Sequence, residues 1–368
     1  MKKTIIVALS VLALAFSNLA KAEMTLSGYT EFFAGSADQT TYQGAENHGL
    51  DLGGMTNGNF ARITANYGST MDSGIEVAGT YTVSGRDCKG GNTGNCNVVD
   101  WNFVTFSGGF GNISVGERFD AGHAMMSRLT ASGPVAEPDG GQIGAFYSGD
   151  GVNSYGNANE VNYADASVKV LYTSNVYSGF SVAVGFTPNM GENGANSDDA
   201  QADSNSNYSD VLSVYGKYAM EMDGVGLQLV YGQQNGNAGR IGTVDYNDLE
   251  ETAYSVKITY AGFEADYRKN EADNSGTAKN GNAGNNEGTS VCAAYGMGNL
   301  RVGACNVETS LTDTSNFSNS GETRTYSAQY ELGGGVNVGV IFFDREEVAN
   351  GVTRTDVDGV ATRLAVGF

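Results

Sequence analysis

The sequence has few prolines, few histidines and no long apolar run beyond its first residues. Three prolines among 368 residues are too few for a proline-rich disordered chain. Two histidines and four cysteines offer little for metal binding, and neither His48 nor His123 has metal-ligand spacing with the cysteines. After residue 22 no stretch approaches 18 consecutive apolar residues, so any role in a membrane must use strands rather than helices.

Basic residues are scarce as well, whereas glycine is abundant. The 20 basic side chains face 41 acidic ones, which gives a formal net charge of −21 and argues against nucleic acid as a partner. The 53 glycines are about double the ordinary usage, which excludes a helical bundle because each interior glycine costs about 1 kcal/mol relative to alanine.

Residues 1–22 have the pattern of a secretory signal peptide. Lys2 and Lys3 precede an apolar core, and Ala20-Lys21-Ala22 fits the small-x-small cleavage rule. A transmembrane helix is the alternative, but the apolar run is short for it. We expect a mature chain of residues 23–368 with 17 basic and 41 acidic residues, a charge of −24. Its destination lies beyond an inner membrane, where disulfides form.

The rest of the chain repeats one pattern of alternating side chains. In the segments 180–186 and 254–260, apolar or aromatic residues alternate with small, polar or charged ones. Such alternation indicates strands with two different environments on their faces. The breaks between them are alternately tight, as at Ala261-Gly262 and Gly298-Asn299, and long, as in 119–159 and 346–355.

Counting these segments predicts a single domain of sixteen strands. An even number of antiparallel strands, with short turns on one side and long loops on the other, is the layout of a transmembrane β-barrel. The expected strands are 24–34, 58–68, 73–83, 98–108, 110–118, 160–174, 178–187, 208–220, 224–234, 249–260, 262–270, 288–297, 300–309, 322–332, 335–345 and 356–368.

The cost of a charge in lipid assigns the two faces. Arg363 would cost about 2–4 kcal/mol facing lipid at the midplane, so its face should point to the lumen. Extending this alternation places a set of bases inside: Arg62, Lys169, Lys217, Lys257, Arg268, Arg301 and Arg363. Ten tyrosines then fall outside as aromatic girdles: Tyr67, Tyr81, Tyr172, Tyr218, Tyr254, Tyr260, Tyr267, Tyr295, Tyr326 and Tyr330. Filling the core of a soluble β-sandwich is the alternative role for these tyrosines.

Several segments resemble the general (non-specific) trimeric porins of Gram-negative outer membranes, most closely the alphaproteobacterial type. The matching segments are Met24 to Tyr29, Phe60 to Ile63, Asp72 to Glu76, Asn102 to Gly116, Val168 to Ser174, Ser178 to Ser181, Tyr326 to Gly335 and the terminal Phe368. The resemblance implies a general diffusion pore for ions and small hydrophilic solutes in the outer membrane. It also implies a homotrimer, contact with lipid and lipopolysaccharide, and Phe368 as the signal read by the barrel-assembly machinery.

The resemblance further implies that the third loop, 119–159, folds into the lumen and narrows it. Its segment Pro134 to Gly141 is similar to the acidic loop motif of the family, which makes Glu137 and Asp139 candidate constriction residues. Arg62 matches a lumen arginine opposite that loop. At the end of strand five the family often has arginine directly after glycine, whereas here Glu117 separates Gly116 from Arg118. We group Arg62, Arg118 and Lys169 as the basic side of the constriction.

The four cysteines predict two disulfides. Cys88 and Cys96 lie in one glycine-rich loop. If Gly298-Asn299 is a two-residue turn, Cys292 directly faces Cys305, and non-hydrogen-bonded pairs of this kind are close enough for a disulfide. Four free thiols are the alternative, which an oxidising compartment disfavours.

Other functions have weaker support in the sequence. We expect no enzyme, because no nucleophile and base stand out, although an outer-membrane lipase or protease barrel is the enzymatic alternative. A substrate-specific sugar or anion channel is the main alternative, and a plugged, non-conducting barrel is a third. We expect no cofactor, although acidic loop residues such as Asp198 and Asp199 could hold Ca²⁺. The acidic loops at the mouth predict a weak cation preference.

Overall fold

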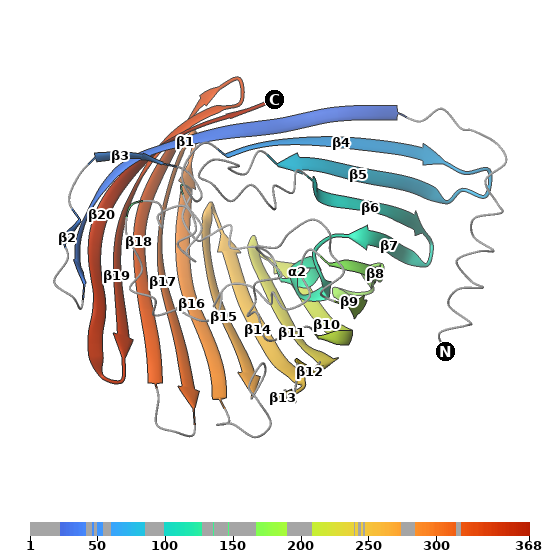
Figure 1. The fold of residues 1–368 in the computed structure, drawn as a ribbon. Coiled ribbons are helices and arrows are strands. Elements are labelled where there is room, and N and C mark those ends of the chain that lie inside the picture. The colour runs from blue at the N-terminus through green and yellow to red at the C-terminus, as the bar shows by residue number, and fades with distance from the viewer. Residues whose placement is uncertain are drawn as a thin grey trace.

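A computed structural model describes the chain over most of its expected strands (Figure 1). The described residues are 23–41, 46–47, 50–53, 60–84, 99–126, 135, 146, 167–189, 208–238, 240–241, 244–245, 247–273, 284–313 and 318–368. Residues 1–22, Cys88, Cys96, Glu137, Asp139, Asp198 and Asp199 lie outside these ranges.

Sixteen antiparallel strands form a closed barrel among the described residues. They are β1 (Glu23–Thr41), β4 (Phe60–Thr70), β5 (Glu76–Ser84), β6 (Val99–Gly108), β7 (Gly111–Glu117), β8 (Val168–Thr173), β9 (Phe180–Asn189), β10 (Ser209–Met222), β11 (Val225–Asn237), β14 (Leu249–Tyr260), β15 (Phe263–Asp273), β16 (Gly284–Met297), β17 (Leu300–Asp313), β18 (Ser318–Gly333), β19 (Val336–Ala349) and β20 (Val352–Gly367). The described elements also include a helix, α2 (Ala121–Met125), and a small hairpin of β12 (Arg240–Ile241) and β13 (Val244–Asp245).

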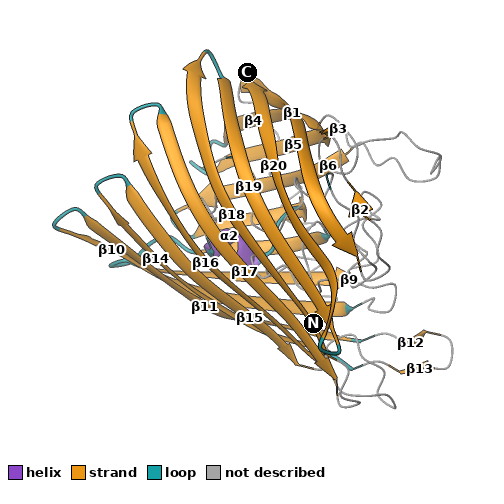
Figure 2. Cartoon of the chain, turned by 90° about the vertical axis from the view of Figure 1, so that its left-hand side faces the viewer, coloured by secondary structure: helices purple, strands orange, loops and turns teal. Residues whose placement is uncertain are grey.

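The first and last strands close the barrel. Each strand pairs with the next one along the chain, and β1 pairs with β20 over residues 29–41 (Figure 2). At the other end of β1, residues 23–31 pair with β4. Two short strands pair with β1 beyond the part that β4 covers. They are β3 (Leu50–Gly53), which pairs with residues 33–36, and β2 (Glu46–Asn47), which pairs with residues 39–40. These additions satisfy backbone groups that would otherwise form an open sheet edge.

Each of the sixteen predicted strands has a counterpart in the barrel, and several are longer than predicted. Residues 160–166 of the predicted strand 160–174 lie outside the described residues. The expected long loop 346–355 is wrong, because β19 and β20 continue to a two-residue turn at Asn350-Gly351. Both turn residues have positive φ, 52° and 75°, as a tight hairpin turn of the Asn-Gly type requires. The asparagine side chain also accepts a hydrogen bond from the Ser318 N–H at 3.0 Å. The residues in these extensions are mostly polar, so their sequence pattern is that of a loop although they form strands.

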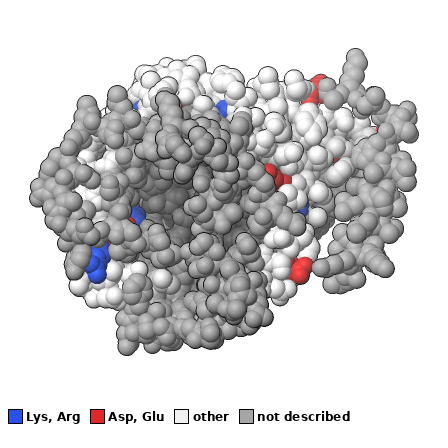
Figure 3. All heavy atoms as spheres, viewed as in Figure 1, with Lys and Arg blue, Asp and Glu red and all other residues white. Residues whose placement is uncertain are grey.

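The two faces of the barrel differ as the alternation predicts. In β20, Val360 and Leu364 are exposed on the outside, whereas Ala361 and Ala365 are buried on the inside. The predicted outer tyrosines include some of the most exposed large side chains, such as Tyr260 and Tyr326. The described surface in Figure 3 is mostly uncharged. In the described residues, no helix combines the length and apolar character needed to cross a membrane.

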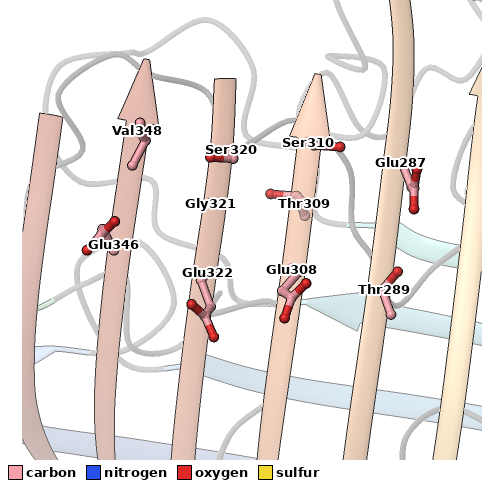
Figure 4. Close-up of a pocket in the computed structure, with 10 residues that line it drawn as sticks. All are labelled: Glu287, Thr289, Glu308, Thr309, Ser310, Ser320, Gly321, Glu322, Glu346 and Val348. Carbon is pink, nitrogen blue, oxygen red and sulfur yellow. The ribbon is translucent and has the colours of Figure 1, made fainter. Parts of the chain in front are cut away.

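The apolar outer band ends at two rows of charged residues on the loop side of β17–β20. Tyr326, Phe342 and Val360 face one another across adjacent strands. The next row along the same strands is Arg324, Asp344 and Asp358, and the row after that is Glu308, Glu322, Glu346 and Asp356. The three glutamates of this last row, Glu308, Glu322 and Glu346, line the pocket in Figure 4. Because carboxylates are excluded from hydrocarbon, these rows mark where the strands leave the apolar layer.

Candidate pore lining

The inner face of β14–β20 carries bases that are paired with acids. The Arg363 guanidinium donates to the Glu31 carboxylate at 2.7 and 2.8 Å, closing β20 onto β1. Glu264 pairs with both Lys257, at 2.8 Å, and Arg301. In the same way Arg345 donates to Glu347 at 2.7 and 2.9 Å. In these contacts acids offset most of the basic charge, since Lys257 and Arg301 share Glu264 while Arg345 and Arg363 each have their own carboxylate.

The inner face of β4–β7 holds its arginines differently. The Arg62 guanidinium carbon lies 4.8 Å from the centre of the Trp101 ring, and that of Arg118 lies 4.7 Å from the centre of the Phe103 ring. Both are cation–π arrangements, in which the electron-rich ring face attracts the cation. Arg118 also donates to the Ser114 hydroxyl at 2.5 Å. This wall therefore presents stacked guanidinium groups.

The start of the third loop packs on the inner face of β8–β11 and β14. In α2, Ala121 and Met125 are fully buried and form one apolar cluster with Leu171, Ala183, Tyr215, Val230 and Ala253. These five residues come from the inward faces of the neighbouring strands. Figure 1 shows the helix within the ring of strands.

A buried polar group fixes the same helix to the wall. Asp120 caps α2, since its carboxylate accepts the His123 backbone N–H at 2.9 Å. The other Asp120 oxygen accepts a hydrogen bond from the fully buried Gln234 amide of β11. Gln234 directly faces Glu251 of β14, which is also buried. The loop thus begins at a fixed point on the barrel.

Two further loop residues contact the opposite part of the wall. Val135 and Phe146 are buried in a cluster with Phe33, Ile341, Phe343, Val357 and Ala361, which belong to β1, β19 and β20. The described parts of the third loop therefore touch inward-facing residues on two sides of the barrel. Glu137 and Asp139 lie between these anchors in sequence but outside the described residues.

The predicted basic residues lie in three different settings. Arg62 and Arg118 lie on the β4–β7 wall, whereas Lys217, Lys257, Arg268, Arg301 and Arg363 lie on the inward faces of later strands. Lys169 of β8 is 1% exposed, and its ammonium donates to the backbone carbonyls of Ser167, at 2.6 Å, and of Arg118. Lys169 therefore holds the chain that leaves β7.

The predicted register of the late hairpin is confirmed. Cys292 directly faces Cys305 across β16 and β17, their Cα atoms are 4.2 Å apart, and a disulfide joins them. Both cysteines are buried on the inner face next to Ala294. The Phe368 backbone exchanges two hydrogen bonds with Gly28, at 2.9 and 3.0 Å, and so ends the barrel seam.

Sequence reasoning missed the aromatic residues beneath the arginines. Trp101 and Phe103 share the inward face of β6, while Val104 and Phe106 share the outward face. Because both faces of this strand are apolar, alternation alone does not say which one faces the lumen. The acidic partners Glu31, Glu264 and Glu347 were also missed. In the described part of the chain, no three His, Cys, Asp or Glu side chains gather into a metal-binding group.

Solved structures with the same fold are outer-membrane proteins. The outer membrane channel DcaP of Acinetobacter baumannii has 10% sequence identity and a TM-score of 0.63, with 96% of this chain and 99% of that one covered. The anion-selective porin of Comamonas acidovorans has 14% identity and a TM-score of 0.59, with 95% and 100% covered. The trimer form of in-vitro folded OmpT, an outer membrane protein of Vibrio cholerae, has 11% identity and a TM-score of 0.58, with 94% and 99% covered.

The sequence itself matches a family model. No curated protein sequence matches this chain. The model described as Gram-negative porin, however, matches residues 8–342. That span contains nearly every barrel strand. It also contains Arg62 and Arg118, which stack on aromatic rings, and Arg301, which pairs with an acid. This chain belongs to the Gram-negative porin family.

Proposed function

We propose that the protein is a general diffusion porin, a non-enzymatic channel that passes ions and small hydrophilic solutes across the outer membrane. The observation that carries this proposal is the division of charge between the faces: ion pairs such as Arg363–Glu31 line the inside, whereas the outer band is apolar. A polar inner face favours hydrated solutes, and the third-loop anchors support a narrowed lumen. Of the three bases grouped as the basic side of the constriction, Arg62 and Arg118 keep this proposed role, whereas Lys169 is buried and bonded to backbone carbonyls. The proposed acidic side is Glu137 and Asp139.

Planar-bilayer recording tests this function. We expect large, steady conductance steps in potassium chloride. Block by one sugar or one inorganic anion at low concentration would instead favour a substrate-specific channel. A folded, inserted protein that carries no current would contradict the proposal.

We further propose a homotrimer of the alphaproteobacterial type, delivered after cleavage at Ala22 and surrounded by lipid and lipopolysaccharide. The trimer form among the similar structures supports this assembly. The outer face of β1 supports it too, since the small Thr30 suits close packing better than lipid contact, whereas the Phe368 ring covers Gly28. Phe368 is the proposed signal for the assembly machinery. An unboiled sample that runs as a monomer on a mild detergent gel would contradict the trimer.

The long acidic loops are also the place where we would look for Ca²⁺. Asp198 and Asp199 remain the candidate ligands. The test is to titrate the isolated trimer with calcium and to measure its melting temperature at each concentration. The channel function itself needs no cofactor.

A further inference from the structure

Two stacked cation–ring pairs lie next to each other on the inner wall. Trp101 and Phe103 are two residues apart on β6, so their rings leave the same face of the strand about 7 Å apart. Arg62 covers the first ring and Arg118 the second. On the wall of β14–β20, Arg301, Arg345 and Arg363 each form an ion pair with a carboxylate.

The aromatic layer continues from β6 into the third loop. The Phe119 ring meets the Trp101 ring edge-on, with 4.5 Å between the centroids, and stacks on the His123 ring at the same distance. Trp101, Phe103 and Phe119 are all half-buried, so part of each ring is accessible. Together they place partly exposed aromatic rings beside the positive charge of this wall.

Arg118 keeps its charge and its hydrogen-bonding capacity. A guanidinium titrates so far above neutral pH that Arg118 stays protonated. Its described side-chain contacts are the Ser114 hydroxyl and the Phe103 ring, and within the described residues no carboxylate forms an ion pair with it. A guanidinium that lies flat on a ring still presents N–H groups at its edge, in the geometry that binds a carboxylate.

We propose that Arg118, Phe103 and Trp101 form a subsite for planar carboxylate solutes, namely aromatic acids, within the pore. The carboxylate binds the N–H edge of Arg118, and the flat ring of the solute lies against the neighbouring aromatic side chains. The inference rests on the proposed channel function and adds to it, because a purely general pore does not distinguish flat rings from puckered ones.

Two acids of equal charge and similar size test the subsite. Benzoate is flat and cyclohexanecarboxylate is puckered, and each is added to single channels in a planar bilayer. We expect benzoate to interrupt the current with an apparent Kd about three- to tenfold lower, as expected for one added aromatic contact. Equal block by both acids overturns the proposal.

Variants locate the effect. Phe103→Leu should abolish the preference for benzoate, and Trp101→Leu is the second variant if the first does not fold. Arg118→Gln should weaken block by both acids, whereas the matched control Arg301→Gln removes a lumen charge elsewhere and should keep the preference. A preference that survives in Phe103→Leu and Trp101→Leu also overturns the proposal. Absence of any conductance in the unmodified protein refutes the channel function, whereas steady conductance without discrimination refutes the subsite alone.

Discussion

Single glycines in this barrel make room for aromatic rings on the next strand. Tyr67 directly faces Gly79, and Phe343 directly faces Gly359. A Cβ atom added at Gly79 would lie 1.9 Å from the Tyr67 ring, and one at Gly359 would lie 2.3 Å from the Phe343 ring. Glycine ordinarily weakens a strand, but here it lets a large ring cover the neighbouring backbone.

Gly359→Ala should therefore destabilise the barrel. Phe343 is buried in the cluster with Val135 and Phe146, so its ring has little space into which to move. Overpacking of this kind costs about 1–3 kcal/mol. The measurement is the urea concentration at the midpoint of unfolding, and the gel mobility of unheated samples reports how much protein is folded.

Gly216→Ala is the matched control for this change. Gly216 also lies in a strand, but a Cβ atom there would meet nothing within 4 Å. If both variants unfold at the same urea concentration, contact with the Phe343 ring does not explain why glycine occupies position 359.

At the scale of elements, the capping carboxylate of α2 should control how steadily the third loop is held. Asp120→Ala removes the helix cap, at a cost of about 1 kcal/mol, and leaves the buried Gln234 amide without its described acceptor. We expect more open-channel current noise in bilayer recordings. Asp358→Ala on the outer face is the control, and equal noise in both variants would argue against the anchor.

The disulfide across β16 and β17 should stabilise that hairpin. Closing a loop of this length contributes about 2–3 kcal/mol in the chain-entropy model. In a Cys88→Ser/Cys96→Ser variant, reduction acts on Cys292–Cys305 alone and should lower the urea midpoint. An unchanged midpoint would contradict the prediction, and a peptide that links Cys88 to Cys292 in the unmodified protein would contradict the pairing.

Alternation and turn chemistry predicted the strands because each strand has a lipid face and a lumen face. The same rule placed Arg363 inside and gave the Cys292–Cys305 register. It could not find the ends of β19 and β20, because strands beyond the apolar layer carry polar residues on both faces. It also could not predict that Arg363 meets Glu31 while Arg118 meets Phe103, because these contacts depend on which strands become neighbours in the closed barrel.

At the scale of the whole molecule, charge is unevenly divided between the predicted loops and the inner wall. Much of the formal charge of −21 lies in the segments predicted as long loops, whereas several inner-wall bases are already paired with acids such as Glu264. We therefore expect a weak cation preference, measured as a reversal potential across a potassium chloride gradient. It should fade as salt rises, because the Debye length is about 10 Å at 0.1 M and shorter above it. A clear anion preference at low salt would contradict this prediction.

The seam between β1 and β20 is the pairing that closes the barrel. Gly28 and Phe368 lie far apart in the sequence, yet they exchange backbone hydrogen bonds. Until β20 has paired with β1, the sheet has two bare edges, each able to pair with another chain. The entropic cost of bringing distant ends together grows only slowly with chain length. An unclosed barrel therefore needs protection of both edges until β1 and β20 meet, because either edge can pair with another chain before then.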